Sequence, residues 1–327
     1  MIILSEKEVQ ANYGMHDAYQ DIKNGIIAMQ QGKIENPFRT VIDFPDYEGS
    51  ALYMPSADFS VQTTATKVVT IFPRNPQVQK PTTQGVLLLS DATNGEHICL
   101  MNASYLTRLR TGALSAVGTN KLARKDSKVL GAIGTGGMAF EQVLGVLEVR
   151  PIEEIILFNR THEKAYTFKQ KLEDFGVTQP IQVVTDVDDI VNNVDIINCA
   201  TRSNDPVFNG ELLRPGTHIN GVGSFLPHMR EVDLTTIDKV DKIIVDDFHG
   251  TKEEAGEFIY AAEHTDWSFD DIYGELQQVE INDDLIRESD QEITFFKSVG
   301  AAYFDLIVAN GTYTKANAMG VGQKVQL

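Results

Sequence analysis

The stretch VLGAIGTGGMAFEQ, residues 129–142, decides the fold. It predicts a short buried strand, a glycine-rich loop and the start of a helix. Gly134, Gly136 and Ala139 supply the G-x-G-x-x-A form of the dinucleotide-binding fingerprint between strand and helix. Glycine at 134 permits a tight turn, glycine at 136 lets the backbone approach a pyrophosphate, and alanine at 139 lets helix and strand pack closely. The alternative is a glycine-rich turn without a ligand, and the context between strand and helix argues against it.

Short apolar stretches and helical stretches alternate around this loop. The sequence predicts strands at 128–133, 154–159, 181–184, 194–199, 218–222 and 242–247, with helices at 137–149 and 162–175. Short strands separated by helical crossovers form a parallel sheet. The fold class is therefore α/β, with a Rossmann-type doubly wound domain.

The residues ahead of this domain predict an α+β module. A helix is expected at 6–31, strands at 38–44, 64–72, 85–91 and 96–102, and a second helix at 103–123. Asn94-Gly95 is a typical turn between the last two strands. Because ARKDS interrupts the helical pattern at 123–127, we place the domain boundary there, giving 1–123 and 124–300. A strand at 292–298 and a helix from 300 lead back to the first module, so that 301–327 completes it.

Composition limits the partners. The chain has 327 residues, is 42% hydrophobic and carries a formal charge of -18, so nucleic acid and anionic membrane surfaces are disfavoured. No run approaches the roughly 20 apolar residues of a membrane span, and acidic residues follow the N-terminal MIIL too soon for a secretory signal. Cys99 and Cys199 lie in apolar stretches typical of buried reduced thiols. We expect a cytoplasmic protein.

The end of the second strand of the doubly wound domain reads Asn159-Arg160-Thr161. An acidic residue at this position would bind the ribose hydroxyls of NAD. Here no carboxylate repels a 2′-phosphate, and Arg160 can meet one with charge-assisted hydrogen bonds. NADP is therefore favoured, while NAD stays possible. The alternative is that Arg160 is a solvated surface arginine.

Across residues 39–320 the chain resembles the ornithine cyclodeaminase/μ-crystallin family. The segments that carry the resemblance, besides the glycine-rich loop, are NPFRT (36–40), TKVVTIFPRNP (66–76), PTTQGVLLLSDATNGE (81–96), LTRLRTGALSAV (106–117), HINGVGS (218–224), EEAGE (253–257) and TFFKSVGAAYFDL (294–306). The resemblance implies a homodimer. It also implies that 1–123 with 301–327 is the substrate-binding and dimerisation domain, and that 124–300 holds the cofactor, whose nicotinamide faces the substrate across the cleft.

The resemblance assigns substrate binding to Arg39, Lys67 and Arg110, with Thr82 near the substrate carboxylate. Arginine binds a carboxylate through two parallel hydrogen bonds, which fixes the α-carbon of an amino acid. Lys67, among cationic neighbours in a partly desolvated site, is expected to have a lowered pKa and to exchange a proton with the α-nitrogen. Lys67 and Arg110 are thus the predicted catalytic residues.

Further cofactor contacts are expected where strands end. Thr201 follows a strand of the doubly wound sheet, and Ser298 to Gly300 match the family segment beside the nicotinamide; ordinary turn chemistry is the alternative. The predicted cofactor-binding positions are Gly134, Gly136, Gly137, Met138, Ala139, Asn159, Arg160, Thr161, Thr201, Val222, Ser298 and Gly300. The seven histidines show no metal-ligand spacing, so no metal is implied.

The segment GVGSFLPHMREVD, residues 221–233, departs from the cyclodeaminase members, which the resemblance implies carry an aspartate shortly after the paired glycines, where this chain has Ser224 and Phe225. Phe225 cannot accept a proton, and REVD is more typical of a helix start. The GS-x-x-P-x-x-RE pattern of this segment resembles instead the alanine dehydrogenase, ketimine reductase and pyrroline-2-carboxylate reductase branches, and this resemblance implies an oxidoreductase of a small α-imino or α-amino acid. An ornithine cyclodeaminase and a non-catalytic NADPH-binding protein remain alternatives. The sequence does not name the substrate.

Overall fold

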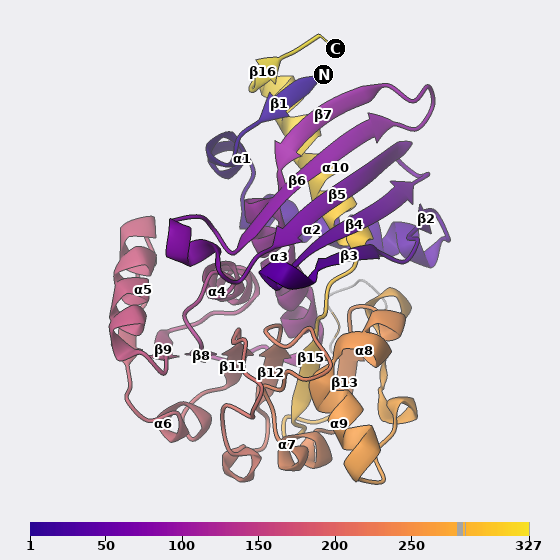
Figure 1. The fold of residues 1–327 in the computed structure, drawn as a ribbon. Helices are drawn as coiled ribbons and strands as arrows, with labels where there is room; N and C mark the ends of the chain where they lie inside the picture. Colours follow the sequence, from indigo (N-terminus) through magenta and orange to yellow (C-terminus); the bar gives the residue numbers. More distant parts are fainter. Residues whose placement is uncertain (280–283, 285, 327) are drawn as a thin grey trace. The chain divides into compact units, whose positions relative to one another are not determined.

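The computed structural model describes residues 1–279, 284 and 286–326. By its internal contacts the chain divides into two units, Met1–Arg110 with Ala301–Leu327, and Thr111–Gly300 (Figure 1). The predicted boundary after residue 123 lies one residue past helix α3 (Ala103–Leu122), whereas this division falls within α3. Residues from 301 onward belong with the N-terminal residues in both divisions.

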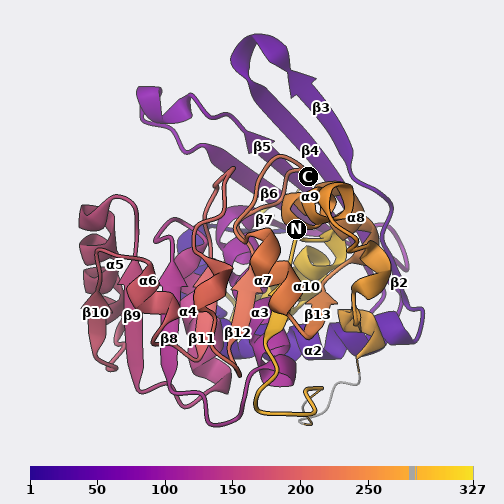
Figure 2. The ribbon, with the colours of Figure 1, turned by 90° about the horizontal axis from the view of Figure 1, so that it is seen from below.

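The second unit contains the doubly wound sheet, in the order β10-β9-β8-β11-β12-β15-β13-β14 (Figure 2). Every pair of neighbouring strands in it is parallel. The strands are β8 (Val129–Ile133), β9 (Glu154–Phe158), β10 (Ile181–Val183), β11 (Ile196–Cys199), β12 (His218–Gly221), β13 (Lys242–Val245), β14 (Gly274–Glu275) and β15 (Thr294–Lys297). The predicted α/β fold class is confirmed.

Each face of this sheet carries its own apolar core, because successive residues of a strand point to opposite faces. Ile156 and Ile197 pack in one core with side chains of α6, α7 and α9. Ile155 and Ile196 pack in the other with side chains of α4 and α5. The helices of this unit are α4 (Ala139–Val149), α5 (His162–Phe175), α6 (Asp188–Val191), α7 (Leu234–Lys239), α8 (Phe248–Glu254) and α9 (Gly256–His264).

The first unit is a mixed sheet with helices packed on it. The strand order is β16-β1-β7-β6-β5-β4-β2, and β3 also pairs with β4. Helix α10 packs against β4, β5 and α2, as Figure 1 shows. The strands are β1 (Ile2–Leu4), β2 (Ile34–Glu35), β3 (Thr40–Phe44), β4 (Gly49–Asp58), β5 (Thr63–Ile71), β6 (Thr83–Asp91), β7 (His97–Asn102) and β16 (Gln323–Lys324), and the helices are α1 (Glu6–Asn12), α2 (Met15–Gln30) and α10 (Ala302–Met319).

Two predictions for the first unit were wrong. The helix expected at 6–31 is two helices, because the chain leaves the helical conformation at Tyr13 and Gly14, where Asp17 accepts a hydrogen bond from the Gly14 N–H and starts α2. Strand β4 was not predicted, and it holds a proline, Pro55, which is rare inside a sheet. Pro55 pairs with Thr66 on one side. On the other side it falls between the end of the β3 pairing and the start of the β2 pairing, where no neighbour needs its missing N–H.

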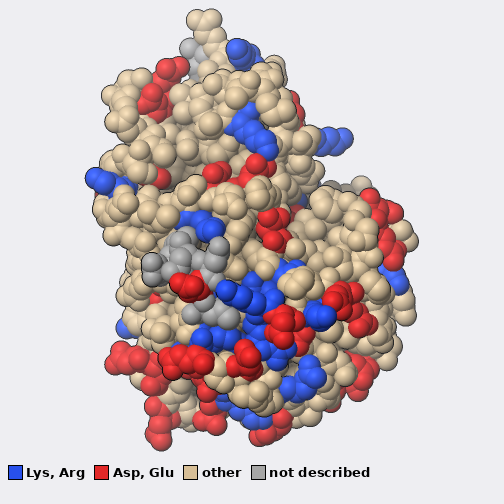
Figure 3. Space-filling view, turned by 180° about the vertical axis from the view of Figure 1, so that it is seen from behind, with Lys and Arg blue, Asp and Glu red and all other residues tan. Residues whose placement is uncertain are grey.

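Lys and Arg side chains gather among acidic ones on one face of the second unit (Figure 3). Several cations of this unit satisfy the backbone at the end of α3. Arg150 is buried and donates to the carbonyl oxygens of Thr119, Asn120 and Ala123. Arg287 donates to the carbonyl of Leu122 at 2.7 Å. Because a helix leaves its last carbonyls unsatisfied and its C-terminus favours cations, these arginines stabilise the end of α3.

No helix in the described part of the chain combines the length and the apolar character that crossing a membrane requires.

Candidate active site

Two of the predicted substrate residues meet in the first unit at a carboxylate that the sequence analysis did not select. Lys67 Nζ on β5 lies 2.5 Å from Oδ2 of Asp305 on α10. Arg110 Nε on α3 lies 3.3 Å from Oδ1 of the same carboxylate. The side chains are buried: Lys67 is 3% exposed, Arg110 7% and Asp305 1%. We call them the Lys67–Asp305–Arg110 cluster.

The charged groups in this cluster shift the pKa values of Lys67 and Asp305. Burial lowers the pKa of Lys67, Asp305 raises it, and Arg110 and Arg39 lower it again, which leaves the pKa of Lys67 at about 8. Burial alone would raise the pKa of Asp305, but Arg110 and Lys67 outweigh it and hold that pKa below its ordinary value. Lys67 is therefore close to half protonated at a mildly alkaline pH, in the direction that the sequence predicts, while Asp305 stays ionised.

Arg110 keeps one donor without a partner. Its Nη1 atom is buried and makes no hydrogen bond with any described residue. A buried guanidinium donor without an acceptor costs free energy, so a ligand that brought an acceptor to this atom would be stabilised there. A carboxylate is the acceptor whose geometry matches the arginine fork.

The other two predicted substrate residues lie less deeply. Arg39 is half-buried ahead of β3, and its positive charge is one cause of the lowered pKa of Lys67. Thr82 is half-buried just before β6, where its carbonyl oxygen accepts from the Phe72 N–H at 2.8 Å. The structure thus brings Lys67 and Arg110 together, with Arg39 close enough to act on Lys67 electrostatically. The carboxylate role of Thr82 stays a prediction.

In the second unit, the glycine-rich loop joins the end of β8 to the start of α4. Gly134 has φ +88°, a conformation that L side chains rarely adopt, and a Cβ there would lie 2.7 Å from the Thr201 side chain. Gly136 and Gly137 are exposed, and a Cβ on either would meet nothing within 4 Å. Gly134 is therefore required by the fold, whereas Gly136 and Gly137 border open space.

This loop fits a dinucleotide pyrophosphate. The N-cap residue of α4, Met138, makes no side-chain capping bond, so the N–H groups of the first turn are not capped by it. Helix N–H groups and the open space beside Gly136 together suit an anion that approaches the backbone closely. Ala139 is buried in the core beneath the loop.

The segment that follows β9 holds the loop from the other side. Asn159 Oδ1 accepts from the Thr135 N–H at 3.1 Å, and its Nδ2 donates to the Thr161 carbonyl at 2.9 Å. Thr161 is the N-cap residue of α5 and makes no side-chain capping bond. Arg160 is exposed. The amide of Asn159 is thus used to position backbone, while the Arg160 side chain faces solvent.

Buried Glu231 ties together two loops at the carboxyl ends of the strands. Its Oε1 accepts from the N–H and the hydroxyl of Thr201, at 2.6 and 2.7 Å, and its Oε2 accepts from the Gly223 N–H at 2.7 Å. The interpretation of REVD as helix-starting acids is therefore right only for Asp233, which caps α7. Burial is the largest influence on Glu231 and raises its pKa.

A second buried group lies behind the same loops. Lys297 Nζ on β15 contacts Glu257 Oε1 at 2.8 Å and donates to the Ser224 carbonyl at 2.6 Å, with both charged side chains 0% exposed. The Ser224 hydroxyl donates to Glu257. Phe225 is half-buried, with the Arg202 guanidinium 5.7 Å from its ring centre. Ser224 and the backbone ahead of Phe225 are therefore held by a buried ion pair.

Asp246, which follows β13, fixes the last predicted cofactor segment. It accepts from the Ser298 hydroxyl at 2.7 Å and from the Gly300 N–H at 2.8 Å. Burial raises the pKa of Asp246. Val222 is buried just after β12, and its N–H donates to the Cys199 carbonyl. The predicted positions 134–139, 201, 222 and 298–300 thus lie just after strands β8, β11, β12 and β15, whose parallel arrangement puts their carboxyl ends on one edge, where ligands of such sheets bind.

The sequence analysis missed the buried acidic partners and one lysine: Asp305, Glu257, Asp246 and Lys297. A signal for two of them was present. Lys297 lies in the apolar strand TFFKS and Asp305 in the apolar helix AAYFDLIVA. A charged residue in a stretch that will be buried needs a partner, and that requirement alone marks both residues.

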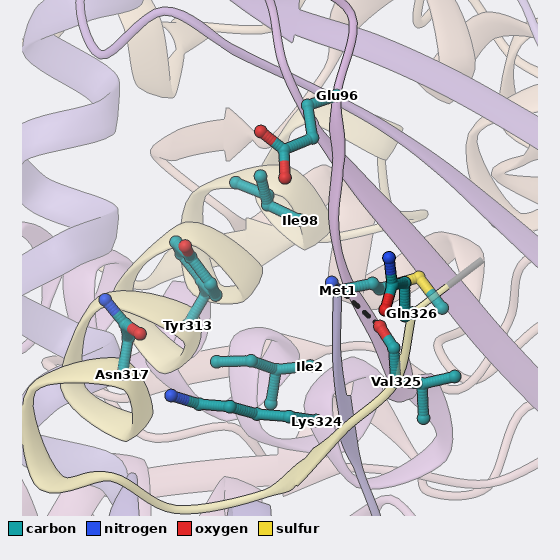
Figure 4. Close-up of a pocket in the computed structure, with 9 residues that line it drawn as sticks. All are labelled: Met1, Ile2, Glu96, Ile98, Tyr313, Asn317, Lys324, Val325 and Gln326. Carbon is teal, nitrogen blue, oxygen red and sulfur yellow. Dashed lines mark hydrogen bonds between the residues drawn. The ribbon is translucent and has the colours of Figure 1, made fainter.

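One hollow of the first unit holds none of the predicted substrate residues. Its volume is about 380 Å³, and it lies where both chain ends meet β7 and α10 (Figure 4). Figure 4 shows the Met1 amino group donating to the Val325 carbonyl beside Tyr313 and Lys324. The predicted substrate-binding residues therefore lie outside this hollow.

The fold and the two sites define a class: a protein with a dinucleotide-binding Rossmann sheet and a buried cationic site suited to a carboxylate. Residues 1–320 match the model of the ornithine cyclodeaminase/mu-crystallin family. The chain belongs to this family, and the predicted resemblance is confirmed.

Several relatives are similar over their full length. The chain is 38% identical to a Δ1-pyrroline-2-carboxylate reductase of Bacillus cereus, with 100% of each chain covered. Its fold matches that of the Thermococcus litoralis Δ1-pyrroline-2-carboxylate reductase in complex with NADH and L-proline, at TM-score 0.94 and 34% identity over 99% of this chain and 100% of that one. An archaeal alanine dehydrogenase dimer with bound NAD matches at TM-score 0.91 and 30% identity over 100% and 99%. These relatives are oxidoreductases of the predicted class.

The open space beside Gly136 yields a test of the cofactor site. In Gly136→Val the added Cβ meets nothing within 4 Å, and the side chain enters the space proposed for the pyrophosphate. We expect the affinity for NADH to fall by about tenfold or more, which is a loss of about 1.4 kcal/mol, with the melting temperature of the unliganded protein unchanged. Fluorescence titration and thermal melts measure the two quantities.

Gly14→Ser is the control, because a Cβ at Gly14 also meets nothing within 4 Å and serine is a favoured residue at this N-cap position of α2. It should change neither quantity. NADH affinity that survives Gly136→Val would place the cofactor elsewhere.

Proposed function

We propose that this protein is an NAD(P)H-dependent reductase of a small cyclic α-imino acid of the Δ1-pyrroline-2-carboxylate type. The observation that carries the proposal is the Lys67–Asp305–Arg110 cluster with its unpartnered Arg110 Nη1. Two buried cations face one buried carboxylate, so a single carboxylate from the substrate balances the charge. The Bacillus cereus and Thermococcus litoralis relatives support this substrate class.

The residues of the first unit divide the work on such a substrate. Arg110 binds the substrate carboxylate through the donor that the protein leaves without a partner, and this fixes the α-carbon. Lys67, with its pKa of about 8, holds a proton that it can give to the imine nitrogen. A bound nicotinamide supplies the hydride that reduces the imine carbon.

Cyclodeamination is disfavoured because no carboxylate beside Phe225 is available as a base. Ornithine cyclisation requires attack by the distal amine as a free base. Of the nearby acids, Asp233 caps α7, Glu231 is bound to Thr201 and Gly223, and buried Glu257 is paired with Lys297. Each carboxylate is already engaged within the protein, so the reductase is the function that the site supports better.

We propose NADPH as the preferred cofactor. The support is that the ribose position holds Asn159, whose amide is already bound to Thr135 and Thr161, while Arg160 is exposed beside it. A guanidinium there suits a 2′-phosphate, and no carboxylate repels it. The Thermococcus litoralis reductase is in complex with NADH and the archaeal alanine dehydrogenase has NAD bound, so NAD(H) stays the alternative. An enzyme of this kind with two buried free thiols, Cys99 and Cys199, suits the cytoplasm, which we propose as its compartment.

We also propose a homodimer formed through the sheet of the first unit. Tyr53, Val68 and Val86 lie opposite one another on β4, β5 and β6, so they share one face. Tyr53 is 39% and Val86 48% exposed. Exposed apolar residues that share a face suit a second copy, and the archaeal alanine dehydrogenase relative is a dimer.

The substrate assignment is tested by Arg110→Lys, which keeps the charge and loses the fork. The unmodified enzyme should reduce Δ1-pyrroline-2-carboxylate, followed by the absorbance of the reduced nicotinamide. In the variant kcat/KM should fall by about 10- to 100-fold, because a hydrogen bond to a charged group contributes about 1.5–3 kcal/mol. The affinity for NADPH should stay unchanged. Conversion of ornithine to proline and ammonia by the unmodified enzyme, at about 1 s⁻¹ or faster, would establish the lyase instead.

Cofactor choice is tested by Arg160→Ala. The affinity for NADPH should weaken by about 1.5–3 kcal/mol, and the affinity for NADH should hardly change. Lys125→Ala removes another exposed cation, in the turn before β8, and should affect neither. Equal losses for both cofactors in Arg160→Ala would refute the 2′-phosphate role.

The dimer is tested by light scattering at micromolar concentration, which should give twice the chain mass of 36.2 kDa. Val86→Asp should shift the protein toward monomer, because it buries a charge in the proposed interface. Val78→Asp, in the loop between β5 and β6 and 64% exposed, should not. A monomeric unmodified protein would contradict the proposal.

A further inference from the structure

Asp305 is the point at which three elements of the first unit converge. Its Oδ2 accepts from Lys67 on β5 at 2.5 Å, and its Oδ1 accepts from Arg110 and from the Thr107 hydroxyl on α3, each at 3.3 Å. Thr107 precedes Arg110 by three residues, so both lie on one face of α3. Among the described residues, Asp305 is the carboxylate that accepts hydrogen bonds from both Lys67 and Arg110.

We infer that Asp305 is the positioning residue of the proposed reduction, holding Lys67 as proton donor and Arg110 as carboxylate binder in one fixed arrangement. The inference rests on the proposed function and deepens it. Each cation is bound through one donor and keeps others for the substrate. Lysine has three N–H donors, of which Asp305 takes one. Arg110 is bound through Nε, and its Nη1 has no acceptor.

Asp305 also decides whether Lys67 carries a proton at all. The charged groups that act on Lys67 are Asp305 from α10, Arg110 from α3 and Arg39 ahead of β3. Burial and the two arginines all favour the neutral amine, and only Asp305 favours the ammonium. Without Asp305 the pKa of Lys67 would therefore fall further below its ordinary lysine value.

Reduction of the imine needs one hydride at carbon and one proton at nitrogen. A reduced nicotinamide, when bound, would supply a hydride to the imine carbon and would itself be oxidised, so that the C=N double bond becomes a single bond. The nitrogen takes the proton of the Lys67 ammonium, and the neutral lysine is reprotonated from solvent. Asp305 gains and loses nothing. It stays ionised, because Arg110 and Lys67 hold its pKa below the ordinary value.

The pH profile of Asp305→Asn tests the inference, because this change removes the charge and keeps the shape. With Lys67 as donor, kcat/KM for reduction of Δ1-pyrroline-2-carboxylate should be constant at low pH and fall as pH rises through the pKa of Lys67. For the unmodified enzyme the fall should lie near pH 8. In Asp305→Asn it should move down by about 1–3 pH units, the usual influence of an adjacent opposite charge.

Two further variants separate this role from a loss of packing. Asp305→Glu keeps the charge, so its fall in activity should lie nearer to that of the unmodified enzyme than to that of Asp305→Asn. Arg108→Gln removes a cation from the same helix, where Arg108 pairs with Glu6 near the surface, and should leave the profile unmoved. A folded Asp305→Asn enzyme whose activity falls at the unmodified pH would overturn the inference.

A measurement without substrate keeps the inference testable if Asp305→Asn does not fold. In protein carrying ¹³C-labelled lysine, the side-chain NMR signal of Lys67 should titrate near pH 8 in the unmodified enzyme. In Asp305→Ser, which removes the same charge with a smaller side chain, the signal should titrate at a lower pH, and titration at the same pH in both proteins would overturn the inference. If the unmodified enzyme reduces no α-imino acid, the proposed function fails, and the NMR titration still decides separately whether Asp305 controls Lys67.

Discussion

The substrate site depends on one constraint: the carboxylate of Asp305 is buried between two cations, and it balances only one of them. Asp305 belongs to α10, Lys67 to β5 and Arg110 to α3, so the ion pairs fix three elements that are far apart in the chain. The uncompensated positive charge and the unpartnered Arg110 Nη1 suit the ligand carboxylate that we propose. Stability and substrate choice thus follow from the same charges.

The second unit uses buried carboxylates in a different way. Glu231 and Asp246 accept hydrogen bonds mainly from backbone N–H groups, and each fixes a loop that follows a strand of the parallel sheet. Such loops carry the ligand contacts of Rossmann folds, and their backbone must be held in place before the cofactor arrives. The open space beside Gly136 and the rigid turn at Gly134 belong to the same arrangement.

The sequence was sufficient for the parallel sheet, the glycine-rich loop and the cationic residues, because these follow from local patterns. The strands predicted around Gly134 lie within a few residues of β8, β9, β11 and β12. It was insufficient for Asp305, Glu257 and Lys297, because their roles depend on distant partners. Asp305 binds Arg110, which is 195 residues away in the chain. Glu257 and Lys297 both bind Ser224, which is 33 and 73 residues away from them. Strand β4 was also missed, and its Pro55 is accommodated because β2 and β3 leave a gap beside it. Tertiary context overrode the local rule in each case.

The central claim is that the buried Arg110 donor is completed by the carboxylate of a small imino or amino acid. A crystal structure of the protein with NAD⁺ or NADP⁺ and L-proline tests it most directly. The account predicts a proline carboxylate oxygen within hydrogen-bond distance of Arg110 Nη1, the proline nitrogen within reach of Lys67 Nζ, and Asp305 still bound to both cations. Proline bound elsewhere, with Arg110 Nη1 still without an acceptor, would contradict the account.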